Sequence, residues 1–374
     1  MTDILGSKVT WIVAAGLACL AGLAWWQHEP VLAWYHVRQL SLAYQENREA
    51  YAKKVAELDQ VAVPRLLDGL QDADAIVCGN MQCALVMLVK KWGVTDARSH
   101  RLVDQLQGRF GSFSGPGQEK VLLLLAGFLQ QEGPRPLPSR LTKAIGEILI
   151  GAEATGEMRS PSLVLAAELV DCVEPGQWID SCREMAERGL KDGRAGVRVA
   201  ALQLAMREPM KKDKDLLEKA LPLLRDGETA VRKAALLVLS TAVDVVREES
   251  LLPLLHDEDL QTQYLCELAL RKRGLTDDDI KLARLISDKA PAVRMRVFQH
   301  LQRMPELTLT EWLRQLSHDP EPAVRAAAVR AAVDRPHVDL TQRLREMADA
   351  DPSETVRLNA RYYAQVVSPR ASLR

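Results

Sequence analysis

A repeating unit of 31 to 34 residues dominates the C-terminal half of this 374-residue chain. An aspartate recurs at that interval, and five and six positions after it stands a pair of residues that is Val-Arg in every copy but one. The six aspartates are Asp192, Asp226, Asp257, Asp288, Asp319 and Asp351. Self-similarity at such a period is the signature of stacked supersecondary units. The chain is therefore predicted to lengthen by repetition and not to divide into separate globular cores.

Each copy predicts a pair of antiparallel helices. Small or apolar residues stand three, four, seven and eight positions after the Val of the pair, as in the segment from Ala234 to Leu239, and these positions share one face of a helix. A second apolar-periodic run precedes each Asp, entered by helix-start signals such as Thr276 to Asp279. Aromatic residues make up only 5% of the chain, which suits many small helix contacts. The predicted fold is an all-α solenoid.

The Asp-x4-Val-Arg pattern resembles the HEAT-repeat family, including its short variety found in bilin lyases, over residues 185–367. In that family the Asp and Arg look structural, bonding within and between adjacent repeats as a ladder. The resemblance implies this scaffold role for Asp192, Arg198, Asp226, Arg232, Asp288, Arg294, Asp319, Arg325, Asp351 and Arg357. The copy with Thr262-Gln263 lacks the Arg, so the ladder is expected to be interrupted there.

The rest of the chain divides around these regular repeats. Residues 59–184 are predicted to form degenerate HEAT-like repeats. In one of them Cys78 replaces the Arg, and in another Glu157 takes the place of the Asp. Residues 30–58 carry a heptad-like seam, which predicts an amphipathic helix that links to and caps the first repeat, with a coiled-coil stalk as the alternative. Short tails complete the chain at 1–8 and 368–374.

Val9 to Trp26 is a run of eighteen residues without a charge, long enough as a helix to span about 27 Å. With Trp residues near both ends, it predicts one N-terminal transmembrane helix and a single-pass membrane protein. A cleaved signal peptide, lipidation at Cys19 and a buried helix are the alternatives. Small residues at Ala14, Ala18 and Gly22 form a stripe suited to a homodimer. The flanking charges leave the side of the membrane open.

No motif predicts chemistry. The cysteines show no metal-binding spacing, so neither a metal nor another cofactor is expected. Cys172 and Cys182 flank a turn and are either bridged or two separate core thiols. His256 and His318 each precede a repeat Asp but stand two repeats apart, too far to share a catalytic centre. We expect the protein not to be an enzyme.

The predicted function is protein binding by a membrane-tethered scaffold, because solenoids expose extended binding surfaces. The alternatives are a lyase or isomerase of the bilin-lyase type and a nucleic-acid-binding HEAT-like protein. The charge balance, 49 Lys and Arg against 50 Asp and Glu, disfavours specific nucleic-acid binding. Side chains off the core stripe that differ between copies, such as Lys233 and Gln299, mark the candidate face. The candidate partner-binding residues are Arg303, Arg330 and Arg361.

Overall fold

The described part of the protein is all-helical and falls into two compact units, Met1–Ala220 and Leu221–Arg374. No strand occurs among the described residues, which confirms the predicted helical class for them. None of the described helices is both long and apolar enough to span a bilayer. The predicted span Val9–Trp26, with Ala14, Ala18 and Gly22, lies outside the described residues. The computed structural model describes residues 29–133, 135–154, 156, 158–174, 178–301, 306–335 and 338–371.

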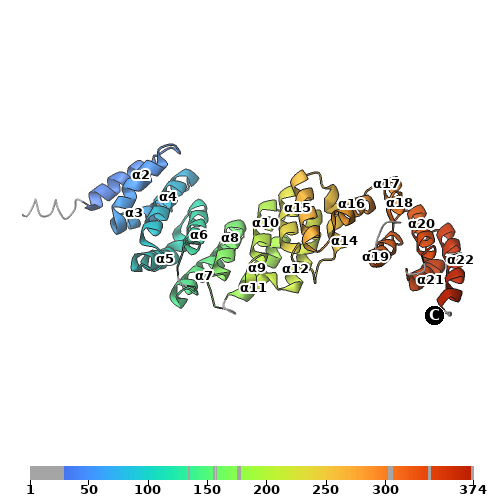
Figure 1. The fold of residues 1–374 in the computed structure, drawn as a ribbon. Helices are drawn as coiled ribbons and strands as arrows, with labels where there is room; N and C mark the ends of the chain where they lie inside the picture. The colour runs from blue at the N-terminus through green and yellow to red at the C-terminus, as the bar shows by residue number, and fades with distance from the viewer. Residues whose placement is uncertain are drawn as a thin grey trace, which may run out of the picture. The chain divides into compact units, whose positions relative to one another are not determined.

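Unit 1 is a series of helical hairpins (Figure 1). After a helix over residues 29–41, its elements are α2 (Arg48–Glu57), η1 (Asp59–Ala62), α3 (Val63–Gly69), α4 (Ala75–Trp92), α5 (Ala97–Arg109), η2 (Phe110–Ser112), α6 (Gly115–Leu129), α7 (Ser139–Ala154), α8 (Arg159–Val170), α9 (Ile179–Leu190), α10 (Ala195–Ala205), α11 (Glu208–Lys211) and α12 (Lys214–Ala220). Helices α2, α4, α6, α8 and α10 pack side by side in chain order, while α5 packs on α7 and α9 on α12. This two-layer stacking is what repeated helical hairpins produce.

The segment 30–58, expected as one helix, forms two. The first helix ends at residue 41 and α2 begins at Arg48. The buried side-chain amide of Asn80, on α4, donates to the carbonyls of Leu40 and Ala43 at 2.9 and 3.0 Å. Carbonyls at the end of a helix have no partner within it, so Asn80 stabilises the break.

A close approach of α6 to the preceding hairpin depends on a glycine. A Cβ atom on Gly117 would lie 1.9 Å from the carbonyl oxygen of Leu70. The helix starts at Gly115, where Ser114 caps it by accepting the Gly117 N–H. Only a residue without a side chain allows this first turn of α6 to rest on the end of α3.

Unit 2 repeats the hairpin in shorter elements (Figure 1). These are η3 (Leu221–Arg225), α13 (Thr229–Leu239), α14 (Glu248–Leu251), η4 (Leu252–His256), α15 (Leu260–Lys272), α16 (Asp277–Ile286), α17 (Pro291–Met295), α18 (Val297–His300), α19 (Glu306–Leu316), α20 (Pro322–Val333), α21 (Thr341–Ala350) and α22 (Glu354–Ala371). We call α13, α15, α17–α18, α20 and α22 the second helices, because each follows the Asp of its repeat. At the C-terminal end, α20, α21 and α22 enclose one apolar cluster that includes Val329, Leu344, Met347 and Val356.

Candidate protein-interaction surface

Each repeat Asp shapes the turn that starts its second helix. Its Oδ1 accepts the backbone N–H of the residue two positions later, at 2.8 to 2.9 Å in all six copies. A side chain that binds its own backbone in this way stabilises a tight turn. The aspartates are thus held in nearly the same geometry, with the rest of the carboxylate available to a neighbour.

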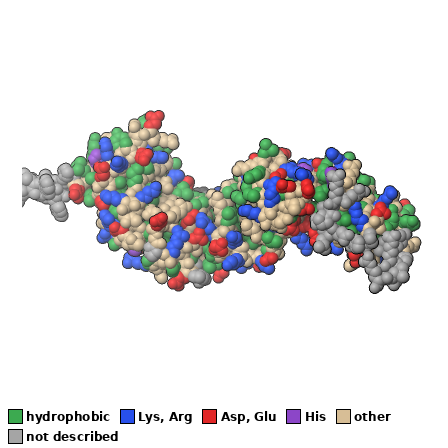
Figure 2. Space-filling view, in the orientation of Figure 1, with side chains coloured by type: hydrophobic (Ala, Val, Ile, Leu, Met, Phe, Trp, Pro, Cys, Tyr) green, Lys and Arg blue, Asp and Glu red, His purple; other side chains and the backbone are tan. Residues whose placement is uncertain are grey.

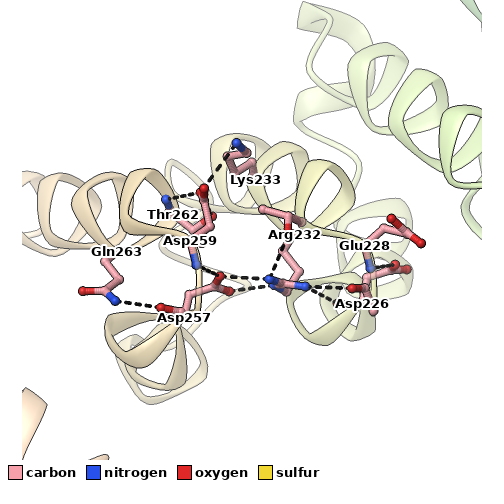
Figure 3. Close-up of polar contacts among 10 residues, drawn as sticks. Asp226, Glu228, Arg232, Lys233, Asp257, Asp259, Thr262 and Gln263 are labelled. Carbon is pink, nitrogen blue, oxygen red and sulfur yellow. Dashed lines mark hydrogen bonds and ion pairs between the residues drawn. The ribbon is translucent and has the colours of Figure 1, made fainter.

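The Arg of the pair joins two successive turns. Arg232 donates from Nη1 to the backbone carbonyl of Asp226 at 2.9 Å, and from Nε and Nη2 to the carboxylate of Asp257 at 2.6 and 2.9 Å (Figure 3). The same arrangement links Arg294 to Asp319 and Arg325 to Asp351. Such bidentate, charge-assisted bonds are the strong class of hydrogen bond. The ladder therefore runs from one repeat to the next.

The last copy and the copy without an Arg make fewer of these hydrogen bonds than the others. Arg357, in the last copy, donates to the backbone carbonyl of Asp351 at 2.7 Å. Gln263 keeps only the bond within its own repeat, to the carbonyl of Asp257 at 2.7 Å (Figure 3). The carboxylate of Asp288 is half-buried and has no arginine hydrogen-bonded to it among the described residues.

In unit 1, the carboxylate of Asp192 is paired with an arginine that the sequence pattern did not single out. Arg198 donates to the carbonyl of Asp192 at 2.9 Å. The carboxylate of Asp192 is held by Arg159, at 2.7 Å, and by Arg194, at 3.1 Å. In this degenerate repeat, the pattern expects an Arg one helical turn further along the chain than Arg159. The pattern therefore does not detect Arg159.

Two of the ladder carboxylates, Asp257 and Asp351, have a pKa below the ordinary value and stay ionised around neutral pH. The hydrogen bonds from Arg232 lower the pKa of Asp257. Burial alone raises the pKa of Asp351, but hydrogen bonds from Arg325 and from the backbone N–H of Ser353 outweigh it and leave that pKa below its ordinary value. These groups therefore serve as fixed anions in ion pairs and are poorly suited to donate protons.

Four of the described cysteines, Cys78, Cys172, Cys182 and Cys266, are buried and lie in structural positions. Cys78 places its Sγ 3.2 Å from the carbonyl oxygen of Asp72, where the regular repeats place the Arg, and Ser114 donates to the same carbonyl at 2.5 Å. Cys172 and Cys182 are free and buried, so the structure favours the unbridged alternative. Burial raises the pKa of Cys182 and of Cys266 to about 12, which disfavours the reactive thiolate.

A second set of positions lies on the exposed side of the second helices in unit 2. These are the residues two and six positions after the Val or Thr that opens each pair, and we call them the second-helix rows. The first row holds Lys233, Tyr264, Met295, Ala326 and Leu358, and the second holds Leu237, Leu268, Gln299, Arg330 and Tyr362. Six of these ten are large apolar residues with exposed side chains. The two with the largest exposed fractions are Tyr264, at 60%, and Tyr362, at 63%.

Exposed large apolar residues at these positions are specific to unit 2. At the equivalent positions of α4, α8 and α10, unit 1 carries Gly79, Cys83, Val164, Glu168, Val199 and Gln203, of which only Gln203 is exposed. On the face drawn in Figure 2, Lys and Arg side chains are interspersed with Asp and Glu. Repeated exposed apolar side chains are the feature that distinguishes interaction sites from ordinary solvated surface. The second-helix rows are therefore the candidate interaction surface.

Of the three predicted partner-binding arginines, Arg330 and Arg361 lie among the described residues. Arg330 is exposed in the second-helix rows. Arg361 is exposed but stands five positions after its Val, outside the rows, and donates from Nε to the carbonyl of Ala348 on α21 at 3.1 Å. Arg303 lies outside the described residues. Lys233 is engaged with Gln261 and Asp259 at 3.1 and 3.5 Å. The sequence pattern pointed to the second helices but did not single out their exposed apolar residues, although large apolar residues off the core stripe were a visible signal.

Two comparisons bear on this surface. A family model for HEAT repeats matches residues 279–364, which include the last three second helices and the Arg294–Asp319 and Arg325–Asp351 pairs. This match supports the HEAT-repeat character of that segment. A search of curated proteins found no match. Among the described residues, no group of three or more His, Cys, Asp and Glu side chains is placed to hold a metal ion.

Proposed function

We propose that the chain is a membrane-tethered helical scaffold that binds another protein through the second-helix rows of unit 2, and that it acts by binding and not by catalysis. The observation that carries the proposal is the repetition of exposed large apolar side chains on four of the five second helices of unit 2, at positions where a solvated helix carries polar ones. The match to HEAT repeats supports it, because repeats of this kind commonly mediate protein interaction.

The chemistry of the rows defines the partner. Tyr264 and Tyr362 are large, rigid side chains of the type that dominates interface energetics. Leu268 and Leu358 extend the apolar area, and the exposed Arg330 supplies a cation beside it. The partner is therefore a protein segment with an apolar face and a carboxylate at its edge, since Arg pairs bidentately with carboxylates.

A double substitution tests the binding surface. Tyr264→Glu with Leu268→Glu places two charges on the exposed side of α15, and we expect loss of the co-purifying partner from detergent-solubilised membranes. Val243→Glu is the matched control, because Val243 is an equally exposed apolar residue outside the second helices. Circular dichroism must show unchanged helix content. If the double variant retains the same partner as the control in quantitative mass spectrometry, the rows are not the binding surface.

The membrane tether is the second part of the proposal. It rests on the uncharged run Val9–Trp26 and its flanking tryptophans. A spanning helix resists extraction at alkaline pH, whereas a peripheral protein is released. We expect the full-length chain to stay in the pellet after membranes are washed with alkaline carbonate. Its release into the supernatant would contradict the tether and leave the binding surface untouched.

A further inference from the structure

Large apolar side chains gather on the surface of unit 1 at the point where the described chain begins. Five of them lie between residues 31 and 44, and we call this set the N-terminal aromatic patch. It consists of Val31, Trp34, Tyr35, Leu42 and Tyr44, with exposed fractions from 44% for Trp34 to 82% for Tyr44. Large exposed apolar side chains grouped within one short segment are typical of an interaction site.

The helix over residues 29–41 does not need these side chains for its own packing. It buries a separate stripe, Ala33, Val37 and Leu40, against unit 1. Val31, Trp34, Tyr35 and Arg38 lie between those positions on the exposed side. The helix thus has two apolar faces, one used by the fold and one without a partner among the described residues.

The patch is fixed rigidly to unit 1. The amide of Asn80, 1% exposed, binds the carbonyls of Leu40 and Ala43 and so holds the end of the helix and the turn that carries Leu42 and Tyr44. Whatever the patch contacts therefore orients the first repeats as well, because α4, which carries Asn80, packs against both α2 and α6.

The position of the patch in the chain points to a lipid surface. Only five residue steps separate Trp26, at the end of the uncharged run, from Val31, and five residues reach at most about 18 Å. The headgroup region of a bilayer is itself roughly 5 to 8 Å thick on each side of the hydrocarbon. A patch tethered this closely to a spanning segment is held next to the headgroups.

The composition of the patch fits the same location. Trp and Tyr are enriched at the membrane–water interface, where an apolar ring meets a polar edge. The guanidinium of Arg38 lies 5.6 Å from the centre of the Trp34 ring, so a cation that phosphate groups attract accompanies the aromatic residue. Apolar area provides the attachment, with the charge as a secondary contribution.

We propose that the N-terminal aromatic patch lies in the headgroup region of the bilayer that residues 9–26 enter, so that unit 1 docks on the membrane surface in one orientation. The inference rests on the membrane tether proposed above. It adds that the described fold itself contacts lipid.

Trp34 provides the test. Full-length protein and its Trp34→Phe variant are reconstituted in phosphatidylcholine vesicles with or without bromine on the acyl chains, and the difference in their fluorescence isolates Trp34. We expect brominated lipid to quench this difference signal, aqueous acrylamide to quench it weakly, and its emission to be blue-shifted. The same measurement on Tyr264→Trp, an exposed position of unit 2, is the control and should show strong quenching by acrylamide.

The outcomes are distinct. Strong acrylamide quenching of Trp34 without an effect of bromine would overturn the proposal, because the patch would then face water. Quenching by neither agent would also overturn it, since a second copy of the chain or another protein would be covering Trp34. Release of the chain from the vesicles by alkaline carbonate would contradict the tether itself, and the docking inference with it.

Discussion

Arg294 makes two kinds of hydrogen bond, and these distinguish the roles of the two aspartates that it contacts. It binds the carboxylate of Asp319, at 2.6 and 2.8 Å, but only the backbone carbonyl of Asp288, at 2.8 Å. The side chains of Arg294 and Asp319 are 8% and 5% exposed, so solvent screens the pair little. The side chain of Asp288 stabilises its own turn instead.

A double-mutant cycle should reveal this difference. We expect Arg294→Ala and Asp319→Ala to be coupled by about 1.5 to 3 kcal/mol, the range for charge-assisted hydrogen bonds. Arg294→Ala and Asp288→Ala should be nearly additive, because the backbone carbonyl remains after the second substitution. The measurement is denaturant unfolding, compared over the same transition in every variant, since repeat arrays need not unfold in one step. Equal coupling in the two cycles would refute the assignment.

Two of the three glycines of α6 offer a paired test of close packing. Gly117→Ala should destabilise the protein by about 1 to 3 kcal/mol or more, because its Cβ would overlap the carbonyl of Leu70. Gly127→Ala should be neutral or stabilising by up to about 1 kcal/mol, since nothing lies within 4 Å of a Cβ there and Ala favours the helix. Thermal unfolding of both variants checks the expectation. A similar loss in both would remove the packing argument.

The lowered pKa of Asp257 predicts a pH dependence of stability. A carboxyl whose pKa is lower in the folded state stabilises that state above the unfolded value, near 4, and this contribution is lost as the pH falls through the folded pKa. Arg232→Gln removes the main cause of the lowering. Unfolding measured between about pH 2 and 6 should therefore show a smaller decline on acidification for this variant than for the unaltered protein. Parallel profiles for the two would argue against the pair.

At the level of elements, periodicity predicted the hairpins because apolar positions spaced by three and four residues must share a buried face. It did not predict the break at residues 42–47. The heptad-like seam runs on through the break, and the contact that stabilises it comes from Asn80, far along the chain. Periodicity also did not single out the apolar residues of the second-helix rows, because it selects the buried stripe and makes no prediction for positions off it, such as Tyr264 and Leu358.

The contact that the ladder lacks at Gln263 can be introduced by a substitution. Gln263→Arg should extend the ladder from the Asp257 carbonyl to the half-buried carboxylate of Asp288, by analogy with Arg232, Arg294 and Arg325. We expect the unfolding transition of unit 2 to gain about 1 to 2 kcal/mol. Gln263→Lys, which adds a charge at the same position without the two-pronged donor of arginine, is the control and should change stability by less than about 0.5 kcal/mol. No gain over this control would show that the turn of Asp288 cannot accept the ladder bond.

At the scale of the whole molecule, the boundary between the compact units falls between Ala220 and Leu221. The sequence pattern predicts the change from degenerate to regular repeats near residue 185. The sequence pattern detects where the Asp and Arg motif is strict. Compactness depends on how tightly each hairpin packs on the next, and several residue combinations achieve that without the motif, as Arg159 does for Asp192. The start of the strict motif and the boundary between the compact units are therefore different features of the chain.

The missing rung at Gln263 also has a mechanical meaning. Along the turn edge of unit 2, arginine–aspartate pairs act as stiff links between repeats, and the step from α15 to α17 lacks one. Contacts elsewhere hold this step, among them the Arg284 bonds to Glu267 and to the Leu255 carbonyl. A row of stacked repeats bends most easily at the step where the fewest contacts join neighbouring repeats. In the proposed tethered scaffold, a partner that pulls on unit 2 should therefore flex it first at this step.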